Sequence, residues 1–189
     1  TKESLVRIAN ALVDVFLVAH ATPPEEVVLD FDATDDPVHG HQVQRFFHGY
    51  YDAYCFLPLY VFAGDHLLCA YLRPSKIDAA KHSRAILKWL VTRLRERWPN
   101  VRIVVRADSG FCRWRMLRWC ERRGVHYLIG LARNSRLAEM AGPWMDKAAA
   151  GFALDPTPKR EFGEVEYARG HLGHQAARDS QGRAPAGQG

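Results

Sequence analysis

The stretch VVRADSGF, residues 104–111, is the most informative part of the sequence, because an apolar run leads directly into a carboxylate, a hydroxyl and a glycine. The apolar residues Ile103 to Val105 are typical of a buried strand, and Asp108 stands where that strand leaves the core. Two interpretations of Asp108 are open. Its side chain either caps a helix that begins near Phe111, or it is a catalytic acid held on a rigid strand end.

A second apolar run ends in acids in the same way. In EEVVLDFDAT, residues 25–34, Asp30 and Asp32 follow Val27-Val28-Leu29. Residues two apart on a strand share one face of the sheet. Acids at the ends of two adjacent strands can converge on a divalent cation, and a set of oxygen ligands favours Mg²⁺ or Mn²⁺ over zinc. The alternative for Asp30 or Asp32 is an ion pair with one of the many arginines.

Hydrophobic periodicity predicts that helices and strands alternate along much of the chain. Helices are expected over 4–18, 78–98, 111–123 and within 134–145; strands are expected over 25–34, on both sides of a turn at 63–66, over 101–108 and 125–132, and more weakly over 161–168. This order predicts an α/β fold. Its central mixed sheet has an antiparallel meander followed by parallel strands of the βαβ type, with helices flanking it.

Composition sets broad limits on function. The 189 residues carry a formal net charge of +5, which allows a polyanionic partner. The four cysteines form no CxxC pair, so we expect reduced thiols and a cytoplasmic protein. No apolar run reaches the roughly 20 residues of a membrane span, and no membrane partner is expected. The chain begins without methionine, which predicts a piece of something longer.

Five motifs occur in a specific order between about Val27 and Leu137. They are VLDFDATDDPVHGHQ, GYYDAYCFLPLYVF, AYLRPSK, VVRADSGF and GVHYLIGLARN. Together they resemble the catalytic core of DDE-type insertion-sequence transposases, of the group called transposase DDE domain group 1. The resemblance implies an RNase H-like fold with three carboxylates that gather two Mg²⁺ (or Mn²⁺) ions. It also implies hydrolytic nicking of DNA at transposon ends, followed by attack of the freed 3′-hydroxyl on target DNA.

The resemblance assigns catalytic and metal-binding roles to two acids of this chain. The first acid falls on Asp32, with Asp30 as the nearby alternative, and the second falls on Asp108. The third, a glutamate, belongs to a helix after an aromatic strand, and we expect it beyond EFGEVEYA at 161–168. The sequence departs from the family there, so none of the glutamates within 161–168 is assigned to the triad.

The end of the chain changes character. From Gly170 onward, Gly, Gln, Ala and Arg dominate, which is typical of a disordered tail or linker. Read one base later, however, these codons permit a peptide with Trp, Lys-Arg-Arg and Glu in the order that the family has there. We therefore hypothesise a frameshift near Ala168 to Gly170. The predicted domains are a helical remnant of an N-terminal region (1–24), an incomplete RNase H-like core (25–168) and a tail (169–189).

These observations predict the transposase of an insertion sequence, truncated and inactive because its third acid is missing. Its expected partner is DNA, both transposon ends and target, and a homo-oligomer is compatible with this. The expected location is the bacterial cytoplasm, in association with the nucleoid. Basic residues that either contact DNA or form a solvated charged face are Arg73, Lys76, Arg113 and Arg115. The alternatives are an inert RNase H-like remnant that binds DNA or intact transposase, and an unrelated metal-dependent nuclease.

Overall fold

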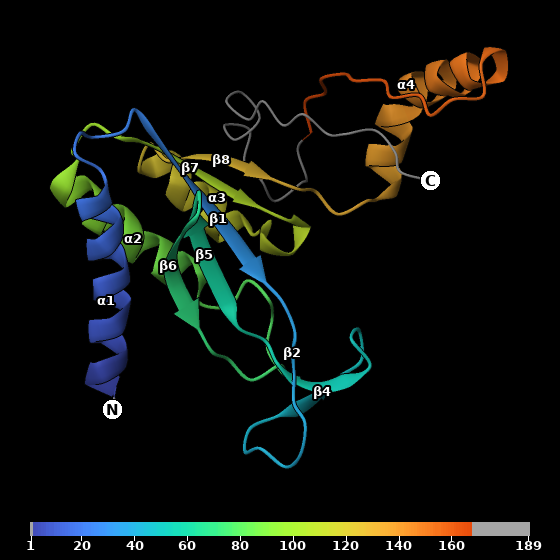
Figure 1. Ribbon diagram of the computed structural model, residues 1–189. Helices are drawn as coiled ribbons and strands as arrows, with labels where there is room; N and C mark the ends of the chain where they lie inside the picture. The colour runs from blue at the N-terminus through green and yellow to red at the C-terminus, as the bar shows by residue number, and fades with distance from the viewer. Residues whose placement is uncertain (1, 168–189) are drawn as a thin grey trace. The chain divides into compact units, whose positions relative to one another are not determined.

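The structure, a computed structural model, describes residues 2–167 of the chain (Figure 1). The chain divides into two compact units, one up to Ile129 and one from Gly130 onward. The first unit contains the predicted sheet with its helices, and the second contains one long helix and the segment that follows it.

The first unit is built on a five-stranded mixed sheet. The strands of this sheet and the helices of the unit are, in chain order, α1 (Lys2–Ala19), β1 (Glu26–Ala33), β5 (Leu59–Ala63), β6 (His66–Tyr71), α2 (Ser83–Arg97), β7 (Arg102–Ala107), α3 (Trp114–Arg122) and β8 (His126–Ile129). The strand order is β6-β5-β1-β7-β8. Strands β1, β5 and β6 form an antiparallel meander, whereas β7 and β8 run parallel to β1. This is the RNase H-like arrangement, and the predicted fold class is confirmed.

The core lies on one face of this sheet. Alternate residues of β1, namely Val27, Leu29 and Phe31, are at most 4% exposed. They join one apolar cluster with residues of α1, α2 and α3, so all three helices cover the same face. The opposite face is less covered, because Phe62 and Leu128 on it remain 37% and 48% exposed. Acids on β1 therefore fall on the open face, since they alternate with the buried residues.

A small second sheet lies between β1 and β5 in the sequence. It consists of β2 (Asp36–Pro37), β3 (Phe46–His48) and β4 (Ala53–Phe56), in the antiparallel order β2-β4-β3. Figure 1 shows it beyond the end of β1. The hydrophobic pattern did not predict these strands, because two to four residues are too few to show a period of two.

Two helices begin later than predicted. Helix α2 starts at Ser83 rather than at 78, because Asp78 Oδ1 accepts a hydrogen bond from the Ala80 amide (2.8 Å) and closes a turn first. His82, just before the helix, has a left-handed backbone with φ of 73°. Helix α3 begins at Trp114 rather than at 111, because residues 109–111 form a separate 3₁₀ turn.

The second unit also differs from its prediction. Helix α4 (Ser135–Leu154) extends well beyond the expected 134–145 and continues past Pro143. Its start is fixed by Asn134, whose side chain accepts a hydrogen bond from the Leu137 amide (3.0 Å). Residues 161–167 form no strand, and the weak strand prediction there is wrong. This segment contacts helical side chains instead, through an ion pair between Glu161 and Lys147 (2.8 Å).

The predicted domain boundaries stay predictions. Helix α1 contributes Val13 and Phe16 to the same core as the sheet. The tail at 169–189, and with it the frameshift hypothesis, lies outside the described residues. Within residues 2–167, none of the helices has the length and apolar character needed to cross a membrane.

Candidate active site

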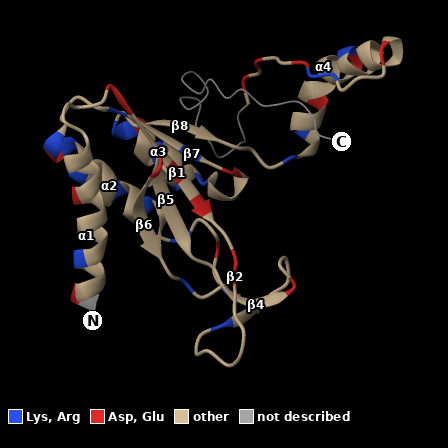
Figure 2. Cartoon of the chain, viewed as in Figure 1, with Lys and Arg blue, Asp and Glu red and all other residues tan. Residues whose placement is uncertain are grey.

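The parallel pairing of β1 with β7 places the two predicted acids side by side. Phe31 is paired with Ala107, so Asp32 and Asp108 are the next residue on each strand. Asp108 keeps an extended backbone (φ −75°, ψ −179°), which continues the strand geometry. Neighbouring strands lie about 4.8 Å apart, so the two acids share one edge and one face of the sheet. Figure 2 shows acidic positions at this end of β1.

Asp30 lies two residues earlier, on the same open face, but its carboxylate is engaged. It is paired in register with Arg106, whose Nη2 donates to Asp30 Oδ2 (2.7 Å) and whose Nε donates to Oδ1. This hydrogen-bonded partner raises the pKa of the Arg106 guanidinium. The ion-pair alternative therefore applies to Asp30. Asp32 is exposed and has no hydrogen bond or ion pair with any residue of the described part of the chain.

The surroundings of Asp108 show a capping role, and its catalytic role stays a prediction. Its Oδ1 accepts a hydrogen bond from the Gly110 amide (2.8 Å), so it caps the 3₁₀ turn at 109–111 rather than helix α3. A Cβ at Gly110 would lie 3.0 Å from Asp108 Oδ1, which explains why a glycine suits this turn. Buried Phe111, 1% exposed, fixes the turn to the core. The cap uses Oδ1 and leaves Oδ2 available to a ligand.

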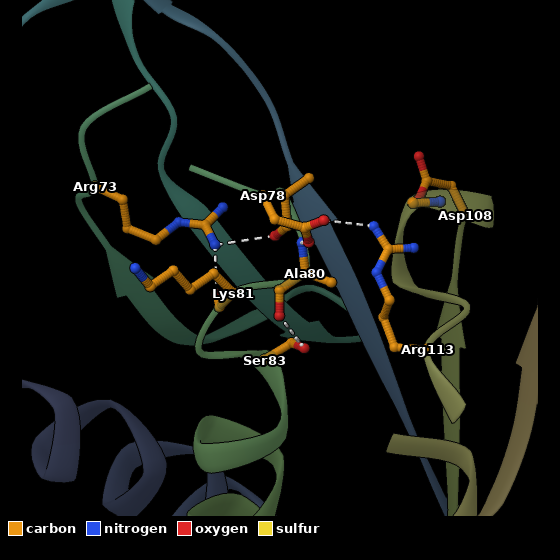
Figure 3. A network of polar contacts seen from close by, with 9 residues as sticks. Arg73, Asp78, Ala80, Lys81, Ser83, Asp108 and Arg113 are labelled. Atoms are coloured by element: carbon orange, nitrogen blue, oxygen red, sulfur yellow. Dashed lines mark hydrogen bonds and ion pairs between the residues drawn. The ribbon is translucent and has the colours of Figure 1, made fainter. Parts of the chain in front are cut away.

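A polar network connects the segment after Asp108 to the loop between β6 and α2 (Figure 3). Arg113 Nη2 donates to Asp78 Oδ2 (2.6 Å), and Asp78 Oδ1 accepts from the Ala80 amide. Partial burial disfavours the charged Asp78 carboxyl, but these two hydrogen bonds, together with the charges of Arg113 and Arg73, outweigh it, and the pKa of Asp78 is lowered. The ion pair holds the loop beside the strand end that carries Asp108.

The same loop is built around a buried arginine. Arg73 is only 1% exposed, and its Nε donates to the Leu57 carbonyl (2.8 Å). Its Nη1 donates to the carbonyls of Ala79 (2.9 Å) and Lys81 (2.7 Å). Burial lowers the pKa of the guanidinium. Arg73 is therefore an internal loop anchor and does not belong to the basic surface that the sequence predicted.

The other predicted basic residues are on the surface. Lys76, Arg113 and Arg115 are all exposed. Arg113 is partly neutralised by Asp78, whereas Arg115, on α3, has no ion pair with any residue within 2–167. The exposed cation seen beside Asp108 is thus Arg113 (Figure 3).

Within the described residues, no third carboxylate joins Asp32 and Asp108. Within residues 2–167, no three side chains of the His, Cys, Asp or Glu type gather in a group that could hold a metal ion. Asp32 and Asp108 fit Mg²⁺ or Mn²⁺ in kind, since their oxygens are the hard donors these ions prefer. They are fewer than the three carboxylates that the family resemblance implies. The glutamates at 161–166 belong to the second unit.

Several solved structures are similar to this chain at low identity. The catalytic domain of Mos1 mariner transposase is 12% identical over 83% of this chain and 74% of that chain, with a TM-score of 0.39. A piggyBac transposase synaptic complex with hairpin DNA is 13% identical over 76% of this chain and 29% of that chain, with a TM-score of 0.41. A Mos1 transposase paired-end complex with left transposon end is 11% identical over 74% and 52%, with a TM-score of 0.37.

The family assignment rests on the sequence itself. No curated protein sequence matches the chain. Residues 1–170, however, match the family described as transposase DDE domain group 1. The match spans all the motifs quoted above and both acids at the strand ends. Because it covers most of the 189 residues, the chain belongs to the transposase DDE domain group 1 family.

Proposed function

We propose that this chain is the core of an insertion-sequence transposase whose Asp32 and Asp108 together bind Mg²⁺ or Mn²⁺. The observation that carries the proposal is the pairing of Phe31 with Ala107, which makes both acids the next residue on adjacent parallel strands. A bound metal ion would supply Lewis-acid stabilisation of a phosphodiester and activate a water molecule. The expected substrate is DNA, at transposon ends and at a target.

The residues around the two acids have distinct roles in this proposal. Asp32 offers both oxygens, since no partner occupies them among the described residues. Asp108 offers Oδ2, because the Gly110 amide holds Oδ1 and fixes the carboxylate orientation. The Asp30–Arg106 pair contributes no net charge beside them. Exposed Lys76 and Arg115 would contact DNA phosphates near the strand ends.

We further propose that this chain does not catalyse strand transfer. The family resemblance implies a third carboxylate, and none joins Asp32 and Asp108 in the part of the chain that the structure describes. Two carboxylates hold a divalent ion less tightly than three, so we expect weak metal binding. A bacterial, nucleoid-associated location and a homo-oligomer remain predictions of this proposal.

Metal binding tests the assignment without requiring activity. We expect Mn²⁺ titration followed by electron paramagnetic resonance to show weak binding that Asp32→Asn and Asp108→Asn both abolish. Asp30→Asn is the matched control, because its carboxylate already pairs with Arg106, and it should retain binding. If Asp32→Asn retains Mn²⁺ binding and Asp30→Asn loses it, the role of the first metal-binding acid belongs to Asp30 instead of Asp32.

A nicking assay tests the chemistry. Supercoiled plasmid with Mg²⁺ or Mn²⁺ should show at most slow nicking that depends on Asp32 and Asp108. Nicking that Asp108→Asn leaves unchanged would remove this residue from the mechanism. Strand transfer by the unmodified chain would contradict the proposed inactivity.

One alternative is favoured because no third carboxylate joins the two acids within residues 2–167: an inert RNase H-like remnant that binds DNA or intact transposase. Electrostatic binding to DNA weakens steeply with added salt. A gel-shift series in increasing salt therefore distinguishes DNA binding from association with another protein. A DNA affinity that is absent at low salt would favour the protein-binding alternative.

A further inference from the structure

The small sheet β2-β4-β3 has two unlike faces. Phe46 is paired with Cys55, and Phe47 is paired with Tyr54. Because neighbouring residues on a strand point to opposite faces, these two pairs lie on opposite sides of the sheet. Cys55 is fully buried, whereas Phe47 and Tyr54 are 54% and 51% exposed.

The face that carries Phe46 is anchored to the loop after β6. Ser75 Oγ donates to the Phe46 carbonyl (3.0 Å), and Lys76 Nζ lies 5.9 Å from the centre of the Phe46 ring. Phe56 at the end of β4 pairs with Pro74 in an isolated bridge. These contacts hold the small sheet to the rest of the first unit, while the rings of Phe47 and Tyr54 on the opposite face stay exposed.

The free face presents two aromatic rings and a guanidinium. The ring centres of Phe47 and Tyr54 are 5.6 Å apart, with an angle of 68° between the ring planes. The Arg45 guanidinium carbon lies 4.7 Å from the centre of the Tyr54 ring. Arg45 is itself exposed and is held by the Gly40 carbonyl and by His41 Nδ1 (3.0 Å). These contacts preorganise the cation over the ring.

A cross-strand aromatic pair also stabilises a short sheet, by about 0.2–1 kcal/mol. That role alone does not account for the exposure of both rings, since this sheet buries Cys55 on its other face. The three strands contain one acid, Asp36, which is paired with Phe56 and therefore lies on the same face as Tyr54, two residues from Phe56 on β4. The charged group that contacts the rings is nevertheless Arg45, and a cation over an aromatic pair suits a ligand with flat faces and negative charge.

We propose that Phe47, Tyr54 and Arg45 form a stacking surface for the bases of unpaired DNA. Every base has a flat π face, so aromatic side chains bind single strands with little sequence preference, and arginine adds attraction to phosphate. The small sheet begins four residues beyond Asp32, and Figure 1 shows it at the same end of β1. The inference rests on the proposed function, since that function makes DNA the ligand of the acids at the neighbouring strand ends.

Fluorescence anisotropy of the full chain with labelled single-stranded dT15 tests this surface. We expect the double variant Phe47→Ala/Tyr54→Ala to lose affinity by roughly 5- to 150-fold for each ring that stacks on a base. Tyr71→Ala is the matched control, because Tyr71 is a similarly exposed tyrosine (44%) on β6, and its affinity should remain within twofold. The conservative variant Tyr54→Phe should also retain binding, since it keeps the π face.

Unchanged dT15 affinity in the double variant would overturn the proposal, and so would an equal loss in Tyr71→Ala. If the double variant unfolds by circular dichroism, Phe47→Leu replaces it, since leucine keeps apolar bulk without a π face. Unchanged affinity of Phe47→Leu then overturns the proposal equally. Mn²⁺ binding of the same variants is measured in parallel. If the chain binds Mn²⁺ but its affinity for dT15 does not depend on the two rings, only the stacking surface is refuted. If the unmodified chain does not bind Mn²⁺, the proposed metal site is refuted.

Discussion

Replacement of Arg73 by leucine should destabilise the first unit severely. The side chain is 1% exposed, yet it carries a charge and donates to three backbone carbonyls. Leucine fills part of the same volume and removes every one of these donors. The carbonyls of Leu57, Ala79 and Lys81 then lose their partner, and the loop before α2 loses its anchor.

The expected magnitude follows from the surroundings of each carbonyl. The hydrogen bond to Leu57 is buried, and an unsatisfied buried acceptor costs about 1–3 kcal/mol. The bonds to Ala79 and Lys81 are only partly buried, so water can replace the donor and each loss costs about 0.5–1 kcal/mol. Removal of a desolvated charge offsets a part of this. The free energy of unfolding should therefore fall by about 2–4 kcal/mol.

Urea unfolding followed by tryptophan fluorescence measures this change, because Trp98 is 3% exposed in the core of the same unit. Arg115→Leu is the matched control; its side chain is exposed, and its stability should stay within about 0.5 kcal/mol of the unmodified chain. Arg73→Lys should fall between the two, since one ammonium reaches fewer carbonyls. A loss below about 1 kcal/mol in Arg73→Leu would refute the anchoring role.

Three further outcomes are expected. Gly110→Ala places a Cβ 3.0 Å from Asp108 Oδ1, so it should displace that carboxylate and weaken Mn²⁺ binding in a titration while the melting temperature changes little. The pKa of Asp78 is lowered from 3.8 in the folded state, so the stability that this carboxylate contributes is present above pH 3.8 and is lost as the pH falls through the lower folded pKa. Asp78→Asn should therefore flatten this part of an acid-unfolding curve. An unchanged slope would contradict the stabilising role of the ion pair with Arg113. Leu90→Ala, at a fully buried position of α2, should cost about 2–5 kcal/mol in urea unfolding.

Local patterns predicted the large sheet and the two acids at its edge. The alternating residues of β1 and the apolar run of β7 are visible over a few residues each, and both runs end in aspartate. Local sequence patterns could not distinguish Asp30 from Asp32 as the first acid, because the difference between them is an ion pair with Arg106, which lies on another strand. The geometry favours Asp32, since the guanidinium occupies both oxygens of Asp30.

Local sequence patterns could not predict the burial of Arg73 either. An arginine within AYLRPSK is typical of an exposed loop, and its internal partners are the carbonyls of Leu57, Ala79 and Lys81, all outside that motif. The hydrophobic pattern did not predict the small sheet, for a related reason. Its strands are too short to show a period, and the pairing of Phe47 with Tyr54 depends on the turn between them.

The pairing of β1 with β7 also constrains how the protein folds. Asp30 and Arg106 are separated by 76 residues, so this contact closes a long loop before it gains any compensating interaction. Parallel strands with such separation form slowly, and the helices that cover them must fold within the same event. The two acids at the sheet edge therefore meet only once β1 and β7 have paired, and any affinity for metal ions should appear together with that pairing during refolding.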